Sequence, residues 1–382
     1  MKYDCELMAR SAFDSSVLLT GFPTFVSRQM ADQILVAEPR TLLYCVVRAK
    51  YAKVAAELLE VMPAERRKRV VLLDGDAAAM DMGLSGAEFR EVTSRIDRIF
   101  HFARVTHLAA PRDLTEYTNV QGATEAIELA SASPSLRSVV MLTSASLAQP
   151  TRGVARETFP SSRMAHKTFV DETFARAERL AHRAMSRIPI AVLRPSIIIG
   201  DSRTGEVDRF DGPYTLVLLI LTSPAAASVP LPIRGDAPLN MVPVDYVVRA
   251  AHRIGSDPAA PGRIFHLVDS SPLPARRVFE LIAHVAGRRS PHGFVPSLVA
   301  RSLLRAPGIE HIVKSPRGFL ELLSTNVRYD AANTDELLRG TGIVCPPFEA
   351  YVDRMVAYVQ ERIRERRRQE SFRVEEAEDP LS

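Results

Sequence analysis

The fold of this chain is decided by the stretch Val17-Leu18-Leu19-Thr20-Gly21-Phe22-Pro23-Thr24-Phe25-Val26-Ser27-Arg28. A short apolar run ends in a glycine, a tight turn follows, and residues 28–35 have the spacing of a helix. A strand, a turn and a helix in this order place the pyrophosphate of a dinucleotide on backbone N–H groups at the helix N-terminus. The stretch therefore predicts a nucleotide-binding turn. The alternative is a strand-to-helix turn that binds no ligand.

Two positions of this turn carry hydroxyl residues where such loops usually have glycine. Thr20-Gly21 stands where the first glycine is expected, and Thr24 and Ser27 occupy the places of the second and third. The second glycine lets the phosphates approach the backbone, and the third lets helix and strand pack closely. Because threonine and serine are small, we expect a phosphate loop that is compromised but not abolished.

The composition is that of an ordinary globular chain, with 382 residues, 46% of them apolar and 25% charged, and a net charge of +4. This small charge gives no case for nucleic-acid binding. Three widely spaced cysteines (Cys5, Cys45 and Cys345) indicate neither a metal cluster nor a disulfide framework, so we expect a reducing, cytoplasmic compartment. The N-terminus does not have the pattern of a signal peptide, and the longest apolar stretch, 216–221, is too short to span a bilayer.

Short apolar runs rich in β-branched residues alternate with helical patterns through the first half of the chain. Continuous apolar runs separated by helices indicate a parallel sheet buried on both faces. Right-handed crossovers then favour an α/β fold with a doubly wound sheet. The runs expected to form strands are 17–19, 42–47, 69–73, 98–101, 139–143 and 190–194, with 265–268 as a candidate seventh.

From residue 195 onward the pattern loosens into short elements with many prolines. Helical spacing covers 276–286, 297–304, 317–323 and a long segment, 347–368. The acidic residues 370–382 have no apolar periodicity and predict a disordered tail. We therefore expect an N-terminal extension (1–14), a dinucleotide-binding core (15–200), a smaller, mostly helical substrate region (201–368) that returns a strand and a helix to the core, and a disordered tail (369–382).

Motifs over most of residues 15–290 resemble, in family order, those of the extended short-chain dehydrogenases. The closest match is the branch of fatty acyl-CoA reductases and of the thioester reductases of carrier-protein systems. The resemblance implies a Rossmann-type fold, NADP(H) as cofactor and a small-molecule or acyl substrate, and it allows a homodimer. The motifs are Thr20-Gly21, Val46-Val47-Arg48, Gly75-Asp76, Leu84-Ser85, His101-Phe102-Ala103, Asn119-Val120-Gln121-Gly122-Ala123, Thr143-Ser144, Leu193-Arg194-Pro195-Ser196 with Gly200-Asp201, Val242-Pro243-Val244-Asp245-Tyr246-Val247, and Phe265-His266-Leu267.

The resemblance also assigns cofactor contacts. Arg48 would pair with a 2′-phosphate and favour NADP(H) over NAD(H), or it is simply an exposed basic residue. Asp76 resembles the carboxylate that contacts the adenine amino group, or it caps the following turn. Arg104 stands where the family has a small residue, and its long side chain would either crowd the site or grip a phosphate. Asn119 resembles the family's structural asparagine, with a helix N-cap as the alternative. The full set of cofactor positions is Thr20, Gly21, Phe22, Thr24, Phe25, Val26, Arg48, Asp76, Ala103, Arg104, Pro195 and Ser196.

The catalytic positions of the family are where this chain departs from it. The family uses a tyrosine hydroxyl as general acid/base and a lysine four residues later, which lowers the tyrosine pKa and holds the nicotinamide ribose. A serine or threonine that ends the fifth strand steadies the substrate carbonyl, and Ser144 supplies that hydroxyl here. Counting back from Ala177-Glu178 places Val170 at the tyrosine position and Phe174 at the lysine position.

A register shifted by one residue gives Phe169 and Thr173 instead, and no tyrosine stands between Tyr117 and Tyr214. Neither register yields the dyad. Valine and phenylalanine neither transfer a proton nor bind a ribose hydroxyl.

Three hypotheses follow. The first is a family member without the standard dyad, which acts as a nucleotide-sensing or scaffold protein with weakened NADP(H) binding. The second is an active NADP-dependent oxidoreductase that reduces fatty acyl or carrier-bound thioesters, or related carbonyls, with Ser144 and a substitute acid/base among Lys167, His166 and Tyr214. Lys167 and His166 have the alternative of being surface residues of the loop before the helix. The third is a module that binds a protein or membrane surface through residues 195–365.

Overall fold

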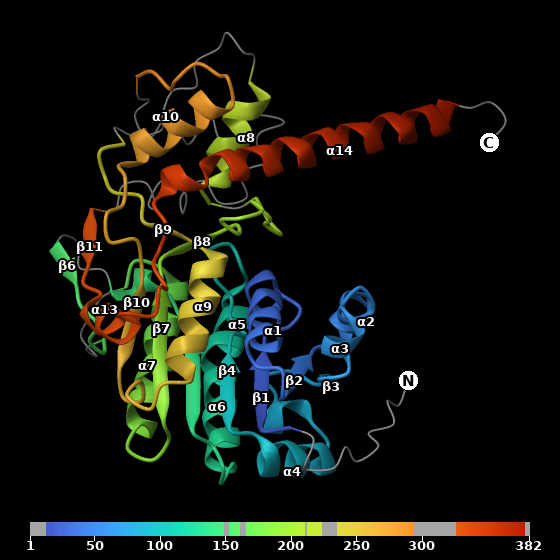
Figure 1. The fold of residues 1–382 in the computed structure, drawn as a ribbon, viewed down its shortest axis with the longest axis vertical. Helices are drawn as coiled ribbons and strands as arrows, with labels where there is room; N and C mark the ends of the chain where they lie inside the picture. Colours follow the sequence, from blue (N-terminus) through green and yellow to red (C-terminus); the bar gives the residue numbers. More distant parts are fainter. Residues whose placement is uncertain are drawn as a thin grey trace.

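A fully parallel seven-stranded sheet forms the centre of the protein, in the order β10-β7-β5-β4-β1-β2-β3 (Figure 1). The computed structural model describes residues 13–148, 153–160, 166–210, 212–223, 235–293 and 326–378. The predicted doubly wound fold is confirmed, and the candidate seventh strand is part of the sheet. The strands are β1 (Ser15–Thr20), β2 (Thr41–Val47), β3 (Val70–Asp74), β4 (Arg98–His101), β5 (Ser138–Leu142), β7 (Ile190–Pro195) and β10 (Ile264–Leu267).

Helices cover both faces of the sheet because successive side chains of each strand enter opposite cores. Leu19, Phe100 and Val140 belong to one core, with α1 (Phe25–Ala37) and α9 (Val244–Gly255). Leu18, Ile99 and Val139 belong to the other, with α4 (Gly86–Arg95), α6 (Gly122–Ser131) and α7 (Phe169–Ala184). The other helical segments around the sheet are η1 (Ala49–Tyr51), α2 (Ala52–Glu60), α3 (Ala64–Arg67), η2 (Met80–Gly83), α5 (Arg112–Glu116), the π-helix η3 (Tyr117–Gln121), η4 (Ala145–Ala148) and α13 (Ala332–Leu338).

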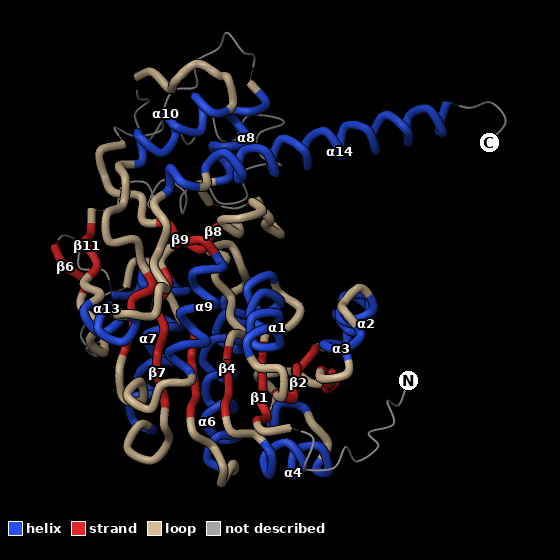
Figure 2. The backbone as a smooth tube through the Cα atoms, in the orientation of Figure 1, coloured by secondary structure: helices blue, strands red, loops and turns tan. Residues whose placement is uncertain are grey.

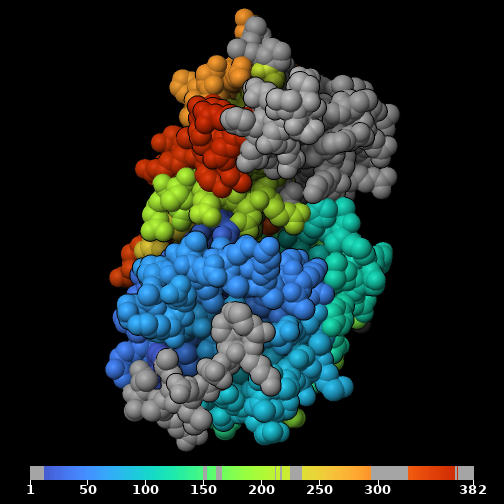
Figure 3. Space-filling view, turned by 90° about the vertical axis from the view of Figure 1, so that its right-hand side faces the viewer, coloured from blue at the N-terminus to red at the C-terminus, as the bar shows by residue number. Residues whose placement is uncertain are grey.

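A second, smaller core lies beyond the carboxyl edge of the sheet (Figure 1). It joins α8 (Tyr214–Thr222), α10 (Ala275–Val285), η5 (Phe348–Ala350) and the start of α14 (Val352–Glu378). Two small parallel pairs connect the layers, β8 (Ile197–Ile199) with β9 (Met241–Pro243), and β6 (Gly153–Ala155) with β11 (Val327–Tyr329). In Figure 3 the yellow-green residues near position 200 lie between the blue core and the red α14.

Two element boundaries differ from the sequence prediction. Helix α1 begins at Phe25, not at residue 28, because Thr24 takes an extended N-cap conformation and Phe25 is buried. Helix α14 continues to Glu378, so the tail predicted to be disordered from residue 369 is helical over most of its length. Its later part has helix-forming residues with opposite charges three apart, such as Arg362–Glu365 at 2.7 Å, which stabilise a helix without an apolar face. Figure 2 shows α14 projecting away from the body.

The helices expected over 297–304 and 317–323 lie outside the described residues. The apolar stretch 216–221 lies in α8, which packs in the second core. No helix in the part of the chain that the structure describes is both long and apolar enough to cross a membrane.

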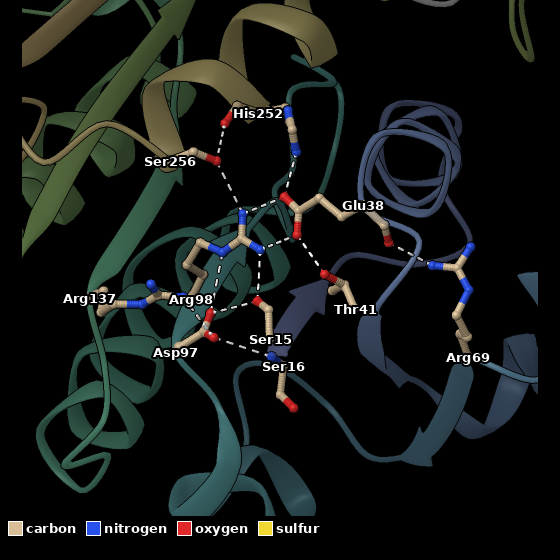
Figure 4. A network of polar contacts seen from close by, with 10 residues as sticks. All are labelled: Ser15, Ser16, Glu38, Thr41, Arg69, Asp97, Arg98, Arg137, His252 and Ser256. Carbon is tan, nitrogen blue, oxygen red and sulfur yellow. Dashed lines mark hydrogen bonds and ion pairs between the residues drawn. The ribbon is translucent and has the colours of Figure 1, made fainter. Parts of the chain in front are cut away.

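A polar network ties the amino edge of the sheet to the helices on one face (Figure 4). Arg98 at the start of β4 donates to Glu38 after α1, and to Ser256 after α9 at 3.1 Å. Glu38 also contacts His252 of α9, with 2.6 Å between Nε2 and Oε1. Burial alone would raise the pKa of Glu38, but the hydrogen bonds from His252 and Arg98 lower it below its usual range. The network fixes the edge opposite the predicted ligand site.

Candidate functional site

The predicted turn closes directly onto the end of β4. Gly21 has φ +86°, and a Cβ there would lie 2.8 Å from the backbone nitrogen of Ala103. The amide of Thr24 donates to the carbonyl of Gly21 at 2.9 Å, which completes the tight turn. Only glycine fits both the conformation and the close approach. The first-glycine position therefore keeps the geometry that a nucleotide-binding turn needs.

Thr20, the residue before this glycine, joins β1 to the end of β4. Its Oγ1 accepts hydrogen bonds from the amides of Phe102 and Ala103, both at 3.1 Å. The same oxygen lies 3.1 Å from Nδ1 of His101. Burial lowers the pKa of His101 to about 4, so its ring is uncharged at neutral pH. Because the Thr20 oxygen already accepts two amide hydrogens, its own hydrogen is the one left for Nδ1 of this ring. Thr20 thus holds the turn and the β4 end together.

The two substituted glycine positions form a short hydrogen-bond chain. Thr24 Oγ1 donates to Ser27 Oγ at 3.1 Å, and Ser27 Oγ donates to the carbonyl of Thr20 at 3.3 Å. Ser27 is fully buried between α1 and β1, so serine is accommodated where the third glycine is usual. Thr24 is exposed at the N-cap, and its hydroxyl hydrogen is directed to Ser27, away from a ligand on the helix N-terminus. Thr24, at the second glycine position, is therefore the residue that we expect to weaken phosphate binding.

Arg48 and Asp76, predicted to contact the adenosine, lie at the ends of the neighbouring strands β2 and β3 and pair with each other. Arg48 Nε lies 3.0 Å from Asp76 Oδ2. Asp76 Oδ1 accepts from the amide of Ala78 at 3.2 Å, so the carboxylate caps its turn as well. Arg48 is thus not merely an isolated exposed charge. Its contact with a 2′-phosphate and that of Asp76 with adenine stay predictions.

Arg104 crosses from the end of β4 to the end of β5. Its Nη1 donates to the carbonyl of Thr143 at 2.6 Å, and burial lowers the pKa of its guanidinium to about 10. It borders a cavity of about 10 Å³, room for about one water molecule. The cavity is lined by His101, Ala103, Arg104, Asn119, Ala123, Met141, Leu142, Thr143, Phe174 and Ala177.

Asn119 lies within the π-helix η3, between α5 and α6. Its Oδ1 accepts from the amide of Val105 at 2.7 Å, and its Nδ2 donates to the Val105 carbonyl at 3.0 Å and to Thr173 Oγ1 at 2.9 Å. The N-cap alternative is wrong, because the residue is in the middle of a helical run. π-Bulges often occur at functional sites. Asn119 here joins the loop after β4 to α7.

The register of α7 is fixed by a buried ion pair. Glu178 and Arg194 of β7 are both 0% exposed, and Arg194 Nε donates to Glu178 Oε1 at 2.9 Å. Thr143 at the end of β5 donates to the same carboxylate oxygen at 2.7 Å. Residues four apart share a helix face, so the face that meets β5 at Glu178 continues through Phe174 to Val170.

Val170 and Phe174 therefore lie on this face of α7. They are 6% and 2% exposed, and they pack in an apolar cluster with Leu147 and Val327. In the alternative register, Thr173 donates to the carbonyl of Val170 at 2.7 Å, and the guanidinium of Arg112 lies 3.9 Å from the centre of the Phe169 ring.

Ser144 is the first member of a hydrogen-bond chain that the sequence did not reveal. Its hydroxyl lies 2.8 Å from that of Ser146, and Ser146 donates to Oδ1 of Asp171, a buried carboxylate in the first turn of α7. Thr168 donates to the other carboxylate oxygen at 2.7 Å. The Thr168-x-x-Asp171 spacing signals a helix N-terminus, which gives no hint of the link to Ser144.

The other proposed acid/base residues lie in different surroundings. Lys167 is exposed and His166 is half-buried, both in the loop before α7. Tyr214 lies in the second core, where its hydroxyl accepts from the amide of Gly200 at 2.9 Å and burial raises its pKa. Tyr214 therefore has neither the position nor the pKa of a base for Ser144.

Pro195 ends β7 and is followed by Ser196, whose amide donates to the carbonyl of Leu267 at 3.0 Å. The Ser196 hydroxyl is buried, with no hydrogen-bond partner among the described residues. A buried hydroxyl without a partner at this edge is suited to a ligand contact.

The turn fits the adenosine and pyrophosphate of a dinucleotide. Gly21 leaves the backbone bare, and the first turn of α1 has no acidic side chain to repel phosphate. At the other end the fit is poorer, because the Arg104 side chain reaches across the ends of β4 and β5, along which the second nucleotide half would pass. The nicotinamide end fits only if Arg104 moves aside.

Comparisons with known proteins point to one family. The NAD-binding family model described as "Male sterility protein" matches residues 19–251. Glycine betaine reductase ATRR of Emericella nidulans is 26% identical over 281 residues, which are 69% of this chain but 22% of that protein. Fatty acyl-CoA reductase wat of Drosophila melanogaster is 22% identical over 62% of this chain and 53% of its own length. The chain thus spans about half or less of these curated relatives.

Solved structures agree in fold. The terminal R domain from the myxalamid PKS-NRPS biosynthetic pathway superposes with a TM-score of 0.76 at 22% identity, covering 93% of this chain and 92% of that one. The reductase (R) domain of a nonribosomal peptide synthetase from Mycobacterium tuberculosis has a TM-score of 0.68 at 19% identity and covers 90% of each chain. With a family model matched over more than half of its length, the chain belongs to the extended short-chain dehydrogenase/reductase family, in the branch that contains the male sterility proteins and fatty acyl-CoA reductases.

Proposed function

We propose that this protein binds NADP(H) weakly and acts as a nucleotide-sensing or scaffold protein, without the standard hydride transfer of its family. The observation that carries the proposal is the apolar face of α7, which packs against Leu147, three residues after Ser144. Val170 and Phe174 are buried there, on the helix face that Glu178 directs to the end of β5. Neither side chain transfers a proton or binds a ribose hydroxyl.

A reduced nicotinamide, when bound, supplies a hydride, and the carbonyl that accepts it must also receive a proton on its oxygen. The positions that would deliver this proton and orient the ribose hold hydrocarbon in this chain. Such a site still binds the nucleotide but has lost the proton transfer. General acid–base catalysis of this kind contributes about 10²–10⁴-fold to the rate of a reaction.

Retained nucleotide binding is supported by the turn and its neighbours. Gly21 keeps the conformation that brings backbone close to phosphate, and the N-terminus of α1 attracts anions. Arg48 at the end of β2 favours a 2′-phosphate and therefore NADP(H) over NAD(H). The Thr24 hydroxyl, directed to Ser27, accounts for the expected loss of affinity.

Thermal unfolding in the presence of nucleotide tests this proposal. NADPH at about a hundred times its Kd should add roughly 2.7 kcal/mol to the free energy of unfolding, and NADH at the same concentration should add less. Arg48→Gln should remove the preference, whereas Lys53→Gln, in an exposed residue of the same segment, should leave it unchanged. Purified protein should not oxidise NADPH in the presence of long-chain aldehydes or acyl thioesters. Substrate-dependent NADPH oxidation would refute the silent site.

The hydrogen-bond chain at Ser144 favours a second candidate, an active NADP-dependent reductase of acyl or carrier-bound thioesters. Ser144 would contact the carbonyl, and Asp171 would exchange protons through Ser146. In that case Ser144→Ala and Asp171→Asn should each abolish NADPH oxidation, while Lys167→Gln should not. Activity that survives both of the first two changes would exclude this assignment.

A cytoplasmic location, which rests on the three widely spaced cysteines, and a homodimer, which rests on the family resemblance, also stay proposals. Sedimentation equilibrium of the purified chain tests the dimer. A single species with the 42.2 kDa mass of one chain at micromolar concentration would contradict it.

A further inference from the structure

Among the described residues, Arg28, Arg48 and Arg104 lie around the carboxyl edge of the sheet, and the first two have carboxylate partners. Arg28 in α1 contacts Asp208, with Glu206 at 3.8 Å, and Arg48 pairs with Asp76 at 3.0 Å. Arg104 is different. Among the described residues no carboxylate lies within ion-pair distance of it, and its hydrogen-bond acceptor is the carbonyl of Thr143.

This contrast extends to arginines elsewhere in the described part of the chain. Arg98 pairs with Glu38 and Asp97, and Arg194 pairs with Glu178. Arg69, which lacks a close carboxylate, donates to three backbone carbonyls instead. A guanidinium has five N–H donors in a planar fork. Since the described residues give Arg104 one acceptor, the Thr143 carbonyl, its guanidinium keeps donors that a bound oxyanion would satisfy.

The location of Arg104 suggests where such an anion would come from. Its backbone adjoins the Gly21 turn, since a Cβ on Gly21 would meet Ala103 at 2.8 Å. Its guanidinium reaches the end of β5, and β4 is the neighbour of both β1 and β5. Because adjacent strands are about 4.8 Å apart, the guanidinium lies about two strand spacings from the turn. A ligand with one phosphate on the α1 N-terminus could extend a second anionic group along this edge.

We propose that Arg104 forms an anion subsite for the terminal phosphate of a nucleoside di- or triphosphate whose first phosphate binds at the Gly21 turn. The inference rests on the proposed nucleotide site and names a ligand class for it. A nicotinamide ring is neutral when reduced and cationic when oxidised, so it gives the guanidinium no negative charge to pair with, whereas a phosphate group takes two of its donors in the bidentate geometry that arginine favours. The chain would then distinguish nucleotides by the charge at their far end.

Calorimetric titration of the full chain with AMP, ATP and inorganic pyrophosphate tests the subsite at low ionic strength. Wild-type protein should bind ATP at least tenfold more tightly than AMP. Arg104→Met should weaken ATP binding about tenfold or more and change AMP binding less than about twofold. Arg104→Lys should keep part of the ATP preference. Arg137→Met removes an exposed arginine at the opposite edge of the sheet and should alter neither affinity.

The outcomes separate the two proposals. If AMP binds and Arg104→Met leaves the ATP affinity unchanged, the subsite is refuted and the nucleotide site stands. If pyrophosphate binds in an Arg104-dependent manner while neither nucleotide binds, the nucleotide site falls, and Arg104 holds a free anion instead of a nucleotide end. If none of the three probes binds, the subsite is refuted, and the NADP(H) site is then decided by the thermal unfolding with NADPH and NADH described above. The melting temperature of each variant, together with Arg104→Lys, distinguishes lost binding from lost folding.

Discussion

Single residues at the Gly21 turn show which departures from a nucleotide-binding loop the structure tolerates. Ser27 is buried with its hydroxyl bonded to the Thr20 carbonyl, so a small polar side chain fits between helix and strand. Gly21 does not tolerate a side chain, because its φ is positive and the end of β4 lies against it. The first and third glycine positions of the motif are thus under different constraints.

Gly21→Ala should therefore destabilise the protein by about 2–4 kcal/mol, from backbone strain of about 1–3 kcal/mol plus the clash with the β4 end. Gly262→Ala is the matched control, since Gly262 has φ +85° but nothing within 4 Å of an added Cβ. The Gly262→Ala substitution should lower the free energy of unfolding only by the backbone strain of about 1–3 kcal/mol. Urea unfolding of both variants measures the difference, and equal losses would mean that the approach of β4 does not constrain Gly21.

At the scale of elements, α7 is the helix whose placement decides the character of the site. It is attached to the sheet by Glu178, which bonds to Arg194 of β7 and to Thr143 at the end of β5. In this position Val170 and Phe174 pack against Leu147, and Asp171 lies within reach of Ser146, which hydrogen-bonds to Ser144. The same helix therefore supplies both the apolar face behind the silent-site proposal and the carboxylate behind the alternative.

Glu178→Gln should destabilise the protein by about 3–5 kcal/mol, because Arg194 would be left as a buried charge without its partner. The control on the same helix breaks an exposed pair, Arg176 with Glu116 at 2.8 Å. Glu116→Gln should cost at most about 1 kcal/mol. Chemical denaturation gives both values, and a loss below about 1 kcal/mol for Glu178→Gln would argue against its role in fixing α7.

Across the whole molecule, buried histidines make stability depend on pH. Burial lowers the pKa of His101 to about 4, and burial with the nearby charge of Arg194 lowers that of His266 to about 3. Both are therefore uncharged in the folded state at neutral pH, whereas the unfolded chain takes up protons near pH 6.5. Between about pH 4 and 6.5 the unfolded state binds more protons, so stability rises with pH in this range.

The free energy of unfolding should accordingly fall as the pH is lowered from 7 towards 4, by the order of 3 kcal/mol for each histidine at the lower end. Denaturant titrations at a series of pH values measure this slope. In His101→Gln the slope should be shallower, because one of the two groups no longer titrates. A stability that is flat between pH 4 and 7 would contradict the assignment.

The strands and the parallel, doubly wound class of the sheet could be predicted because the information for them is local. Each strand of this sheet is an apolar run long enough to be buried on both faces, and the helices between them dictate right-handed parallel crossovers. The position of α7 was likewise predictable from residues 177–178, and the structure attaches Glu178 to β5 and β7. The boundaries of α1 and α14 were less predictable, since the first depends on a cap and the second on charge pairs instead of an apolar stripe.

By itself, then, the sequence determined the parallel sheet and the glycine turn at its edge, whereas the roles of Val170 and Phe174 stay predictions. Only the tertiary structure decided the partners of the polar groups: Arg104 with the Thr143 carbonyl 39 residues away, Ser146 with Asp171, and Asn119 inside a π-helix. The physical reason is the distance along the sequence over which each kind of interaction acts. Periodicity and turn chemistry act over a few neighbouring residues, whereas a long polar side chain takes whichever acceptor the packed chain brings within about 3 Å.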